Sequence, residues 1–387
     1  MMNIQFEFTT VPRIIFGAGA VRAVGENSKV FGACALVVTG RDPRRAEQLI
    51  ADLRQRGTGV ATFAVAGEPE IATVEQGISL AKAEKCNSVI GFGGGSVIDA
   101  AKAIAALLTN EGVLLDYLEI IGRGQTLKKW SAPFFAIPTT AGTGSEVTRN
   151  AVLASPEHKL KVSLRSRLML ARMAIIDPEL TYDLPPALTA STGLDALTQL
   201  IEPFVCSRAN PMTDGLCAEG IRRAARSLRN AFTDGKNKLA REDMAVASLF
   251  GGLALANAGL GAVHGFAGPI GGSFPVPHGA ICAALLPHVM AANIRSLRQR
   301  AAGGDALRRY DEVARLLTDN AIATADDGVK WVRELVSDLQ IKQLGTYGIR
   351  EDHVADLVAK AANASSMKAN PITLTPVELA ETLRAAI

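Results

Sequence analysis

Cysteine is scarce and net charge is nearly absent in this chain of 387 residues, and each shortage excludes a class of protein. The five cysteines contain no Cys-x-x-Cys pair and make no even set. They argue against a disulfide scaffold and a cysteine-built zinc site, and favour a reducing, cytoplasmic location. Lysine and arginine number 41 and aspartate and glutamate 38, a difference of +3, so no nucleic-acid partner is expected. Apolar residues make up 48%, which excludes a disordered chain.

Charged residues are missing altogether between Met244 and Ile294. A membrane-spanning helix needs only about 20 apolar residues, but glycine pairs and prolines interrupt this run. Its histidines would also be costly in lipid. The run therefore predicts buried helices of a globular domain, and no membrane partner is expected.

The first half of the chain alternates β-branched stretches with segments of helical spacing. Strands are expected at 35–39, 60–65, 88–92, 133–137, 151–154 and 173–176, and helices at 44–56, 70–82 and 96–108. The opening segment from Met1 to Arg13 lacks the layout of a signal peptide and is predicted to be a strand. Alternating strands and helices predict an α/β domain with a Rossmann-like parallel sheet, an architecture that suits nucleotides.

The second half is predicted to be all helical. Pro185 and Pro186 mark the boundary, because proline suits a first helical turn and disfavours helix before it. Helices are expected at 187–204, 210–231, 240–257, a broken pair through 292, 303–318, 325–339, 351–362 and 376–386. The sequence thus predicts two domains, a nucleotide-binding domain over 1–185 and a helical metal and substrate domain over 186–387.

Two loops rich in small residues follow predicted strands. Gly91 to Lys102 (GFGGGSVIDAAK) opens a helix, where glycines and free N–H groups favour a diphosphate. The spacing matches neither the P-loop nor GxGxxG, so a plain tight turn is the alternative. Pro138 to Thr148 (PTTAGTGSEVT) is dense in hydroxyl groups and is equally typical of an ordinary capped turn.

A histidine and carboxylate set is the candidate reactive site. Asp195 and Gln199 are four residues apart and project from one helix face. His264 and His278 flank a glycine-rich bend, and one Asp with two His is a plausible set of divalent-metal ligands. The alternative is that each histidine is a hydrogen-bonded core residue. His288 is expected to be structural, and His158 and His353 to be solvated.

Taken together, several motifs resemble those of the iron-containing, group III alcohol dehydrogenases. They are GFGGGSVIDAAKA, PTTAGTGSEVT, AIIDPEL, GLDALTQLIE, GAVHGFAGPIGG and PHGAICAALLPHV, and the similarity extends from Arg13 almost to the end. The resemblance implies an α/β domain and a helical domain with a cleft between them, usually in a homodimer. It also implies hydride transfer between NAD or NADP and an alcohol or carbonyl substrate, with a divalent metal on the substrate oxygen.

The resemblance also implies roles for particular residues. Gly94, Gly95 and Ser96 resemble the diphosphate loop and Asp99 the acid behind it, while Thr139, Thr140, Thr143, Asn150 and Lys161 resemble positions that line the cofactor. Asp195, His264 and His278 match three metal ligands, and Gln199 stands where the fourth, normally a histidine, is expected. A neutral amide is a poorer ligand, so Fe²⁺ or Zn²⁺ should bind more weakly. Without metal, His264 or His278 would have to donate the hydrogen bond or proton to the carbonyl oxygen.

Two further positions widen the choice of function and cofactor. Gly268 replaces a histidine that the family carries four residues after His264. This change is consistent with the related, metal-independent maleylacetate reductases, although Asp195 argues against them. A lyase like dehydroquinate synthase and a non-catalytic nucleotide-binding protein are also compatible with the sequence. Gly40 stands where, by the resemblance, NAD-preferring members often carry an aspartate, so NADP is allowed, with Arg41 or Arg44 to pair with its phosphate. The alternative is that these arginines form a solvated basic helix start, which leaves NAD open as well.

Overall fold

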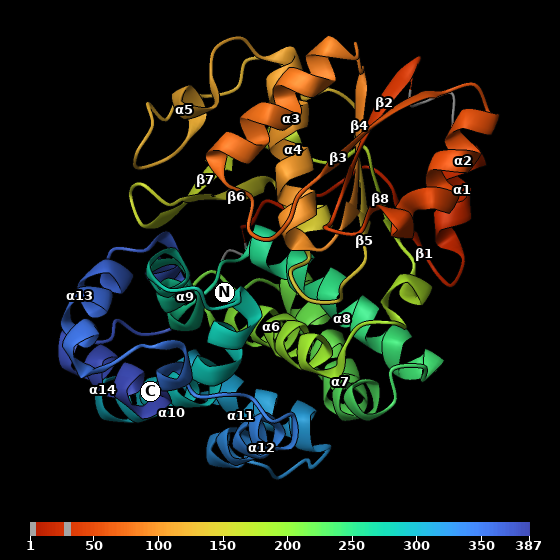
Figure 1. Cartoon of the computed structure of the whole chain (residues 1–387). Coiled ribbons are helices and arrows are strands. Elements are labelled where there is room, and N and C mark those ends of the chain that lie inside the picture. The colour runs from red at the N-terminus through yellow and green to blue at the C-terminus, as the bar shows by residue number, and fades with distance from the viewer. Residues whose placement is uncertain (1–4, 27–31) are drawn as a thin grey trace. The chain divides into compact units, whose positions relative to one another are not determined.

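The computed structural model describes residues 5–26 and 32–387 (Figure 1). The chain divides into two compact units. The α/β unit joins residues 10–140 to residues 144–181, and the helical unit joins residues 182–387 to the short segments 5–9 and 141–143. The sequence places the boundary between Pro185 and Pro186, and the units separate between Thr181 and Tyr182.

The α/β unit contains, among its described residues, a six-stranded sheet in the order β1-β8-β5-β4-β2-β3. All its strand pairs are parallel. The strands are β1 (Ile14–Phe16), β2 (Cys34–Thr39), β3 (Gly59–Ala64), β4 (Ser88–Gly93), β5 (Phe134–Pro138) and β8 (Met173–Ile176). Strands β2, β4 and β5 are uninterrupted apolar runs because both faces of a parallel sheet are covered. The predicted parallel α/β domain is confirmed.

Helices cover both faces of this sheet (Figure 1). They are α1 (Ala23–Glu26), α2 (Glu47–Gln55), α3 (Ile71–Ala83) and α4 (Gly95–Thr109), while the short helix α5 (Leu114–Tyr117) lies to one side of these layers. Leu49 and Leu53 of α2 pack in one buried cluster with Ile90 of β4 and Phe135 of β5. On the opposite face, Gly91 leaves no room for a side chain because a Cβ there would lie 3.0 Å from the Cβ of Ala101 in α4.

An antiparallel hairpin, β6 (Asn150–Ser155) with β7 (Leu160–Arg165), lies outside the main sheet. The sequence predicted its first strand and missed its second. The strand predicted at the N-terminus is wrong for residues 5–13, and residues 1–4 lie outside the described residues. The Thr9 amide instead donates to Oδ1 of Asn257 in helix α8 (Lys238–Asn257) at 2.6 Å. This N–H group is therefore not available for a hydrogen bond to a neighbouring strand.

The helical unit is built from consecutive helices, as predicted. They are α6 (Pro186–Val205), α7 (Pro211–Thr233), α8 (Lys238–Asn257), α9 (Ala262–Ser273), α10 (His278–Arg300), α11 (Asp305–Thr318), α12 (Ala325–Asp338), α13 (Glu351–Ala362) and α14 (Pro376–Ala386). Their starts follow local rules: Asn210 caps α7 by accepting from the Thr213 amide at 3.2 Å, and Pro186 occupies the first turn of α6.

The charge-free run forms most of α8, all of α9 and the first part of α10. Among the described residues, α10 by itself is long and apolar enough to cross a membrane, and α8 with α9 would qualify only as one span bent by 96°. However, 83% of the apolar window of α10 is buried inside the protein. Ile281, Cys282 and Leu285 are fully buried in the helical core, which accounts for the lack of charge.

Candidate active site

The glycine loop lies where the sequence places it, between the end of β4 and the start of α4. A Cβ on Gly93 would lie 2.6 Å from the Val97 side chain, so this glycine is required for the tight turn itself. Among the described residues no side chain caps α4. The start of α4 therefore keeps the positive end of its dipole uncovered, which is the arrangement that binds phosphate groups.

The second loop is joined to the first at the carboxyl edge of the sheet. Thr139, directly after β5, donates its amide to the Gly93 carbonyl at 2.9 Å. A Cβ on Gly94 would lie 3.4 Å from the Thr140 side chain. Gly40 follows the neighbouring strand β2, and a Cβ there would meet nothing within 4 Å. Ligands of open α/β sheets bind beyond this edge. The predicted cofactor residues of these loops therefore lie where a nucleotide cofactor would bind.

Asp99 holds the two loops together from inside α4. Its Oδ1 accepts from the Ser145 hydroxyl and its Oδ2 from the Val152 amide at 3.0 Å. Lys102, one turn further on and 1% exposed, donates to the Asn150 carbonyl at 2.6 Å and to the Ser145 carbonyl at 2.9 Å. Burial raises the pKa of Asp99 and lowers that of Lys102. Sequence reasoning missed Lys102, although its three-residue spacing from Asp99 on a mostly apolar helix was a usable signal.

The other predicted cofactor residues, Asn150, Lys161 and Thr143, have different surroundings from one another. Asn150 gives its backbone carbonyl to Lys102. Lys161 is 7% exposed at its side chain and pairs with Glu68, with 3.1 Å between Nζ and Oε1. Thr143 belongs to the helical unit with residues 141–142, where a Cβ on Gly142 would lie 2.7 Å from Thr192 of α6.

Three helices of the helical unit bring the predicted metal ligands together. Asp195 comes from α6, His264 from α9 and His278 from the first position of α10. Asp195 Oδ1 lies 3.4 Å from His264 Nε2 and 3.7 Å from His278 Nε2. Cys282, one turn after His278, completes a group in which all four candidate ligand atoms lie within 4.8 Å of one another. Sequence reasoning missed Cys282, although its four-residue spacing from His278 was a usable signal.

His264 is held by a buried carboxylate on its far side. Its Nδ1 lies 2.6 Å from Glu202 Oε2, while Glu202 Oε1 accepts from the Val263 amide at 2.7 Å. Burial alone would lower the pKa of His264, but Cys282, Glu202 and Asp195 raise it well above its usual value. Burial raises the pKa of the Cys282 thiol to about 12. A carboxylate behind a histidine fixes the ring so that the other nitrogen faces the cluster.

Two buried oxygen atoms of the cluster have no hydrogen-bond partner among the described residues, Asp195 Oδ1 and Gln199 Oε1. Burial alone would raise the pKa of Asp195, but His278, His264 and a hydrogen bond from Gln199 lower it, so the carboxylate stays charged. Buried acceptors without a donor are costly unless a cation or another ligand satisfies them. The donor set of one carboxylate, two imidazoles and one sulfur therefore fits a divalent metal ion.

Comparison with known families agrees with this geometry. The model for iron-containing alcohol dehydrogenase matches residues 12–178, and the model for the C-terminal part of the Fe-containing alcohol dehydrogenase family matches residues 189–387. The chain belongs to the iron-containing alcohol dehydrogenase family. These matches confirm the family that the sequence motifs indicated.

Individual relatives are similar over nearly the whole chain. Long-chain-alcohol dehydrogenase 1 of Geobacillus thermodenitrificans (strain NG80-2) is 37% identical over 97% of both chains. A solved 1,3-propanediol oxidoreductase is 35% identical with a TM-score of 0.91, covering 99% of this chain and 100% of that one. Sulfoacetaldehyde reductase from Bifidobacterium kashiwanohense, solved in complex with NAD⁺, is 26% identical with a TM-score of 0.85 over 99% of both chains.

This member of the iron-containing alcohol dehydrogenase family is an enzyme, an oxidoreductase that interconverts an alcohol and its carbonyl compound by hydride transfer. A maleylacetate reductase and a dehydroquinate synthase-like lyase are not favoured by these relatives.

Gly268, which stands where the family resemblance implies a histidine, has free space around it. A Cβ on Gly268 in α9 would meet nothing within 4 Å, so no other side chain of the described residues fills the space directly around it. The other histidines lie apart from the cluster: His158 Nδ1 is 2.9 Å from the Ser155 hydroxyl, and His353 packs edge-on against Phe274. No neighbouring side chain of the described residues therefore takes the place of a histidine directly at Gly268.

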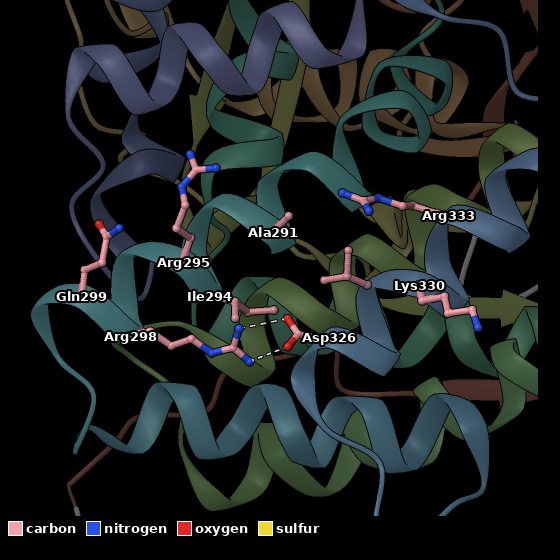
Figure 2. Close-up of a pocket in the computed structure, with 9 residues that line it drawn as sticks. Ala291, Ile294, Arg295, Arg298, Gln299, Asp326, Lys330 and Arg333 are labelled. Atoms are coloured by element: carbon pink, nitrogen blue, oxygen red, sulfur yellow. Dashed lines mark hydrogen bonds and ion pairs between the residues drawn. The ribbon is translucent and has the colours of Figure 1, made fainter.

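A pocket of about 500 Å³ lies elsewhere in the helical unit, between α10 and α12 (Figure 2). It is lined by basic side chains including Arg295, Arg298, Lys330 and Arg333. Arg298 is paired with Asp326 through two bonds of 3.0 and 2.8 Å, as Figure 2 shows. None of the described cluster residues lines this pocket. It is therefore separate from the candidate active site.

Proposed function

We propose that this enzyme is an NAD-dependent, metal-assisted alcohol dehydrogenase. The observation that carries the proposal is the buried group of Asp195, His264 and His278, in which Asp195 Oδ1 has no hydrogen-bond partner among the described residues. A buried carboxylate that faces two imidazoles and has an oxygen without a hydrogen-bond partner among the described residues fits a divalent cation better than a packed core.

Each residue has a separate task in this proposal. Asp195, His264 and His278 would hold the ion, and Glu202 fixes His264 with its Nε2 toward the cluster. A bound divalent ion acts as a Lewis acid on the substrate oxygen and stabilises the alkoxide. His278 is the most exposed of the three, with 32% of its side chain accessible, so the substrate is expected to approach from its side.

NAD is the preferred cofactor in this proposal. The uncapped start of α4 offers the site for its diphosphate. Arg44, which could have bound the phosphate of NADP, is engaged by Asp42 through bonds of 2.8 and 2.9 Å. Asp42 thus masks Arg44 and adds a negative charge beside it, which disfavours a 2′-phosphate. The relative solved with NAD⁺ supports the same choice.

Two properties of the enzyme in the cell belong to the proposal as well. The family resemblance supports a homodimer, which light scattering on the eluting protein would test. The five cysteines, all among the described residues, form no disulfide, which supports the reducing environment of the cytoplasm. The substrate is proposed to be a small alcohol or the corresponding aldehyde or ketone.

The test uses protein purified without chelator and a panel of alcohols and aldehydes, each with NAD(H) and with NADP(H). Turnover is measured as the change in absorbance of the reduced cofactor, and a typical enzyme turns over at about 10 s⁻¹. We expect turnover with NAD(H), and a loss of at least about 10²-fold in kcat for His264→Gln. His158→Gln, the same change in a histidine outside the cluster, should leave kcat unchanged. Equal activity in His264→Gln and the native enzyme would contradict the proposal.

A further inference from the structure

We propose that Cys282 is the fourth protein ligand of the metal ion, and that this chain has moved a ligand from Gln199 on α6 to α10. The inference rests on the proposed function only in that both require a divalent ion in the cluster. It assigns the site an Asp-His-His-Cys ligand set, suited to thiophilic ions such as Zn²⁺, Fe²⁺ or Co²⁺ rather than Mg²⁺ or Ca²⁺.

Four distances between candidate ligand atoms lie within about 0.4 Å of the edges of a coordination tetrahedron. Metal–nitrogen and metal–oxygen bonds of about 2.0 Å give edges of about 3.3 Å, and a metal–sulfur bond of about 2.3 Å lengthens the edges to sulfur to about 3.5 Å. Cys282 Sγ lies 3.9 Å from His264 Nε2 and 3.7 Å from His278 Nε2. Asp195 Oδ1 lies 3.4 and 3.7 Å from the same two nitrogens. Sulfur and carboxylate thus occupy equivalent positions relative to both imidazoles.

Helix geometry explains why Cys282 reaches the ion. His278 and Cys282 are four residues apart on α10, so their side chains leave the same face of the helix one turn apart. Cys282 and Asp195 are both fully or almost fully buried, and His264 is 9% exposed, so the sulfur points into the cluster and away from solvent. The substrate oxygen would enter as a further ligand from the more exposed side of His278.

Gln199 is less suited to the same task. Its side chain shares a hydrogen bond with Asp195, and because a carboxylate only accepts, the Gln199 amide nitrogen is the donor. The amide oxygen that remains is neutral and binds borderline or soft ions less well than a thiolate does. Gln199 is therefore a positioning residue for Asp195, and the sulfur compensates for the histidine that α6 lacks.

Binding of the ion to Cys282 is an exchange of a proton for a metal. The S–H bond breaks, its proton leaves to solvent, the sulfur keeps the electron pair, and the metal–sulfur bond forms without any change of oxidation state.

The test uses Co²⁺ added to the full-length, metal-free protein, followed by absorption spectroscopy. A thiolate ligand gives a near-ultraviolet sulfur-to-cobalt charge-transfer band, which oxygen and nitrogen ligands do not give. We expect the band in the native protein and in Cys206→Ser, a control in another buried cysteine of the same unit. Cys282→Ser should lose the band and bind Co²⁺ at least about tenfold more weakly. Thermal melting checks that both variants fold.

A double variant keeps the test decisive if Cys282→Ser folds poorly. Gln199→His with Cys282→Ser returns an imidazole to α6, so Co²⁺ affinity should recover while the charge-transfer band stays absent. Stoichiometric Co²⁺ binding without the band in the native protein would overturn the inference, as would an absence of Co²⁺ binding. A native protein that shows the band but oxidises no alcohol would uphold the Cys282 ligand and overturn the proposed function instead.

Discussion

Glu202 decides how His264 meets the cluster. It is 5% exposed, and its two oxygens are used by different partners, the Val263 amide and His264 Nδ1. The imidazole is thereby held as a donor to Glu202 through Nδ1, which leaves Nε2 as the nitrogen that faces Asp195. Partners of this kind raise the basicity of a ligating histidine and fix its orientation.

We predict that Glu202→Gln weakens metal binding about 10- to 100-fold, because the amide keeps the shape but loses the charge behind the imidazole. Competition of the protein with a coloured chelator for Zn²⁺ would measure the affinity. Glu381→Gln, a change in an exposed ion pair with Arg295, is the control and should have no effect. Unaltered Zn²⁺ affinity in Glu202→Gln would show that this carboxylate has no role at the ion.

Gly40 directly follows β2, at a position where a carboxylate could select the cofactor. A Cβ there meets nothing within 4 Å, so a larger side chain fits without moving its neighbours. We predict that Gly40→Asp raises the ratio of kcat/KM for NAD over NADP about tenfold, because the acid binds the ribose hydroxyls and repels a 2′-phosphate. Gly40→Ala should leave the ratio near that of the native enzyme. A ratio that stays the same in Gly40→Asp would place the adenosine ribose elsewhere.

The start of α14 is tied to the end of α10 by one carboxylate, Glu378. It accepts from Arg300 at 2.7 Å, from Ser296 at 2.5 Å and from the Thr375 amide at 2.7 Å. These hydrogen bonds, the one from Arg300 first, lower the pKa of Glu378 to about 2. Because its pKa is lower in the folded than in the unfolded chain, Glu378 stabilises the fold above a pH of about 4.5. That stabilisation is lost as the pH falls toward about 2.

We predict that Glu378→Gln lowers the free energy of unfolding by about 1–2 kcal/mol at pH 7. The difference from the native protein should shrink as the pH is lowered from about 4.5 toward about 2, because the native carboxyl group is then also neutral. Urea unfolding at a series of pH values measures this difference. A difference that does not depend on pH would assign the effect to packing rather than to charge.

Local rules predicted the helices of the second half well, because caps and prolines set their starts. Asn210 and Thr375 both cap helices in the structure, at α7 and α14. The missed strand β7 (Leu160–Arg165) is short and carries charged residues, so apolar patterning did not reveal it. The N-terminal strand was predicted from alternation alone, but a strand also needs a partner with free backbone groups, and Thr9 is bonded to Asn257.

The reactive cluster was only partly predictable for a different reason. Asp195, His264 and His278 could be named from motifs, but they meet only because α6, α9 and α10 pack together, which no local spacing describes. Cys282 lies in an apolar stretch of α10 and has the sequence appearance of a core residue. Its place beside the two imidazoles follows from the packing of three helices.

For the molecule as a whole, the helical unit contains a largely buried polar cluster that a bound ion would join. Three helices contribute to it, so an ion should stabilise the folded chain relative to the unfolded one. We predict that saturating Zn²⁺, at about 100 times its Kd, adds about 2.7 kcal/mol and raises Tm by roughly 5–10 °C in differential scanning calorimetry. Mg²⁺ should give no shift, and an equal shift with both ions would point to weak binding at the surface.

The most direct measurement of the central claim is an anomalous difference map from crystals of the Zn²⁺-loaded enzyme, collected on both sides of the zinc absorption edge. The account predicts one strong peak in each chain, within bonding distance of Asp195, His264 and His278. A map with no peak there, or with its zinc peak at another site, would contradict the claim that these buried groups hold a metal ion.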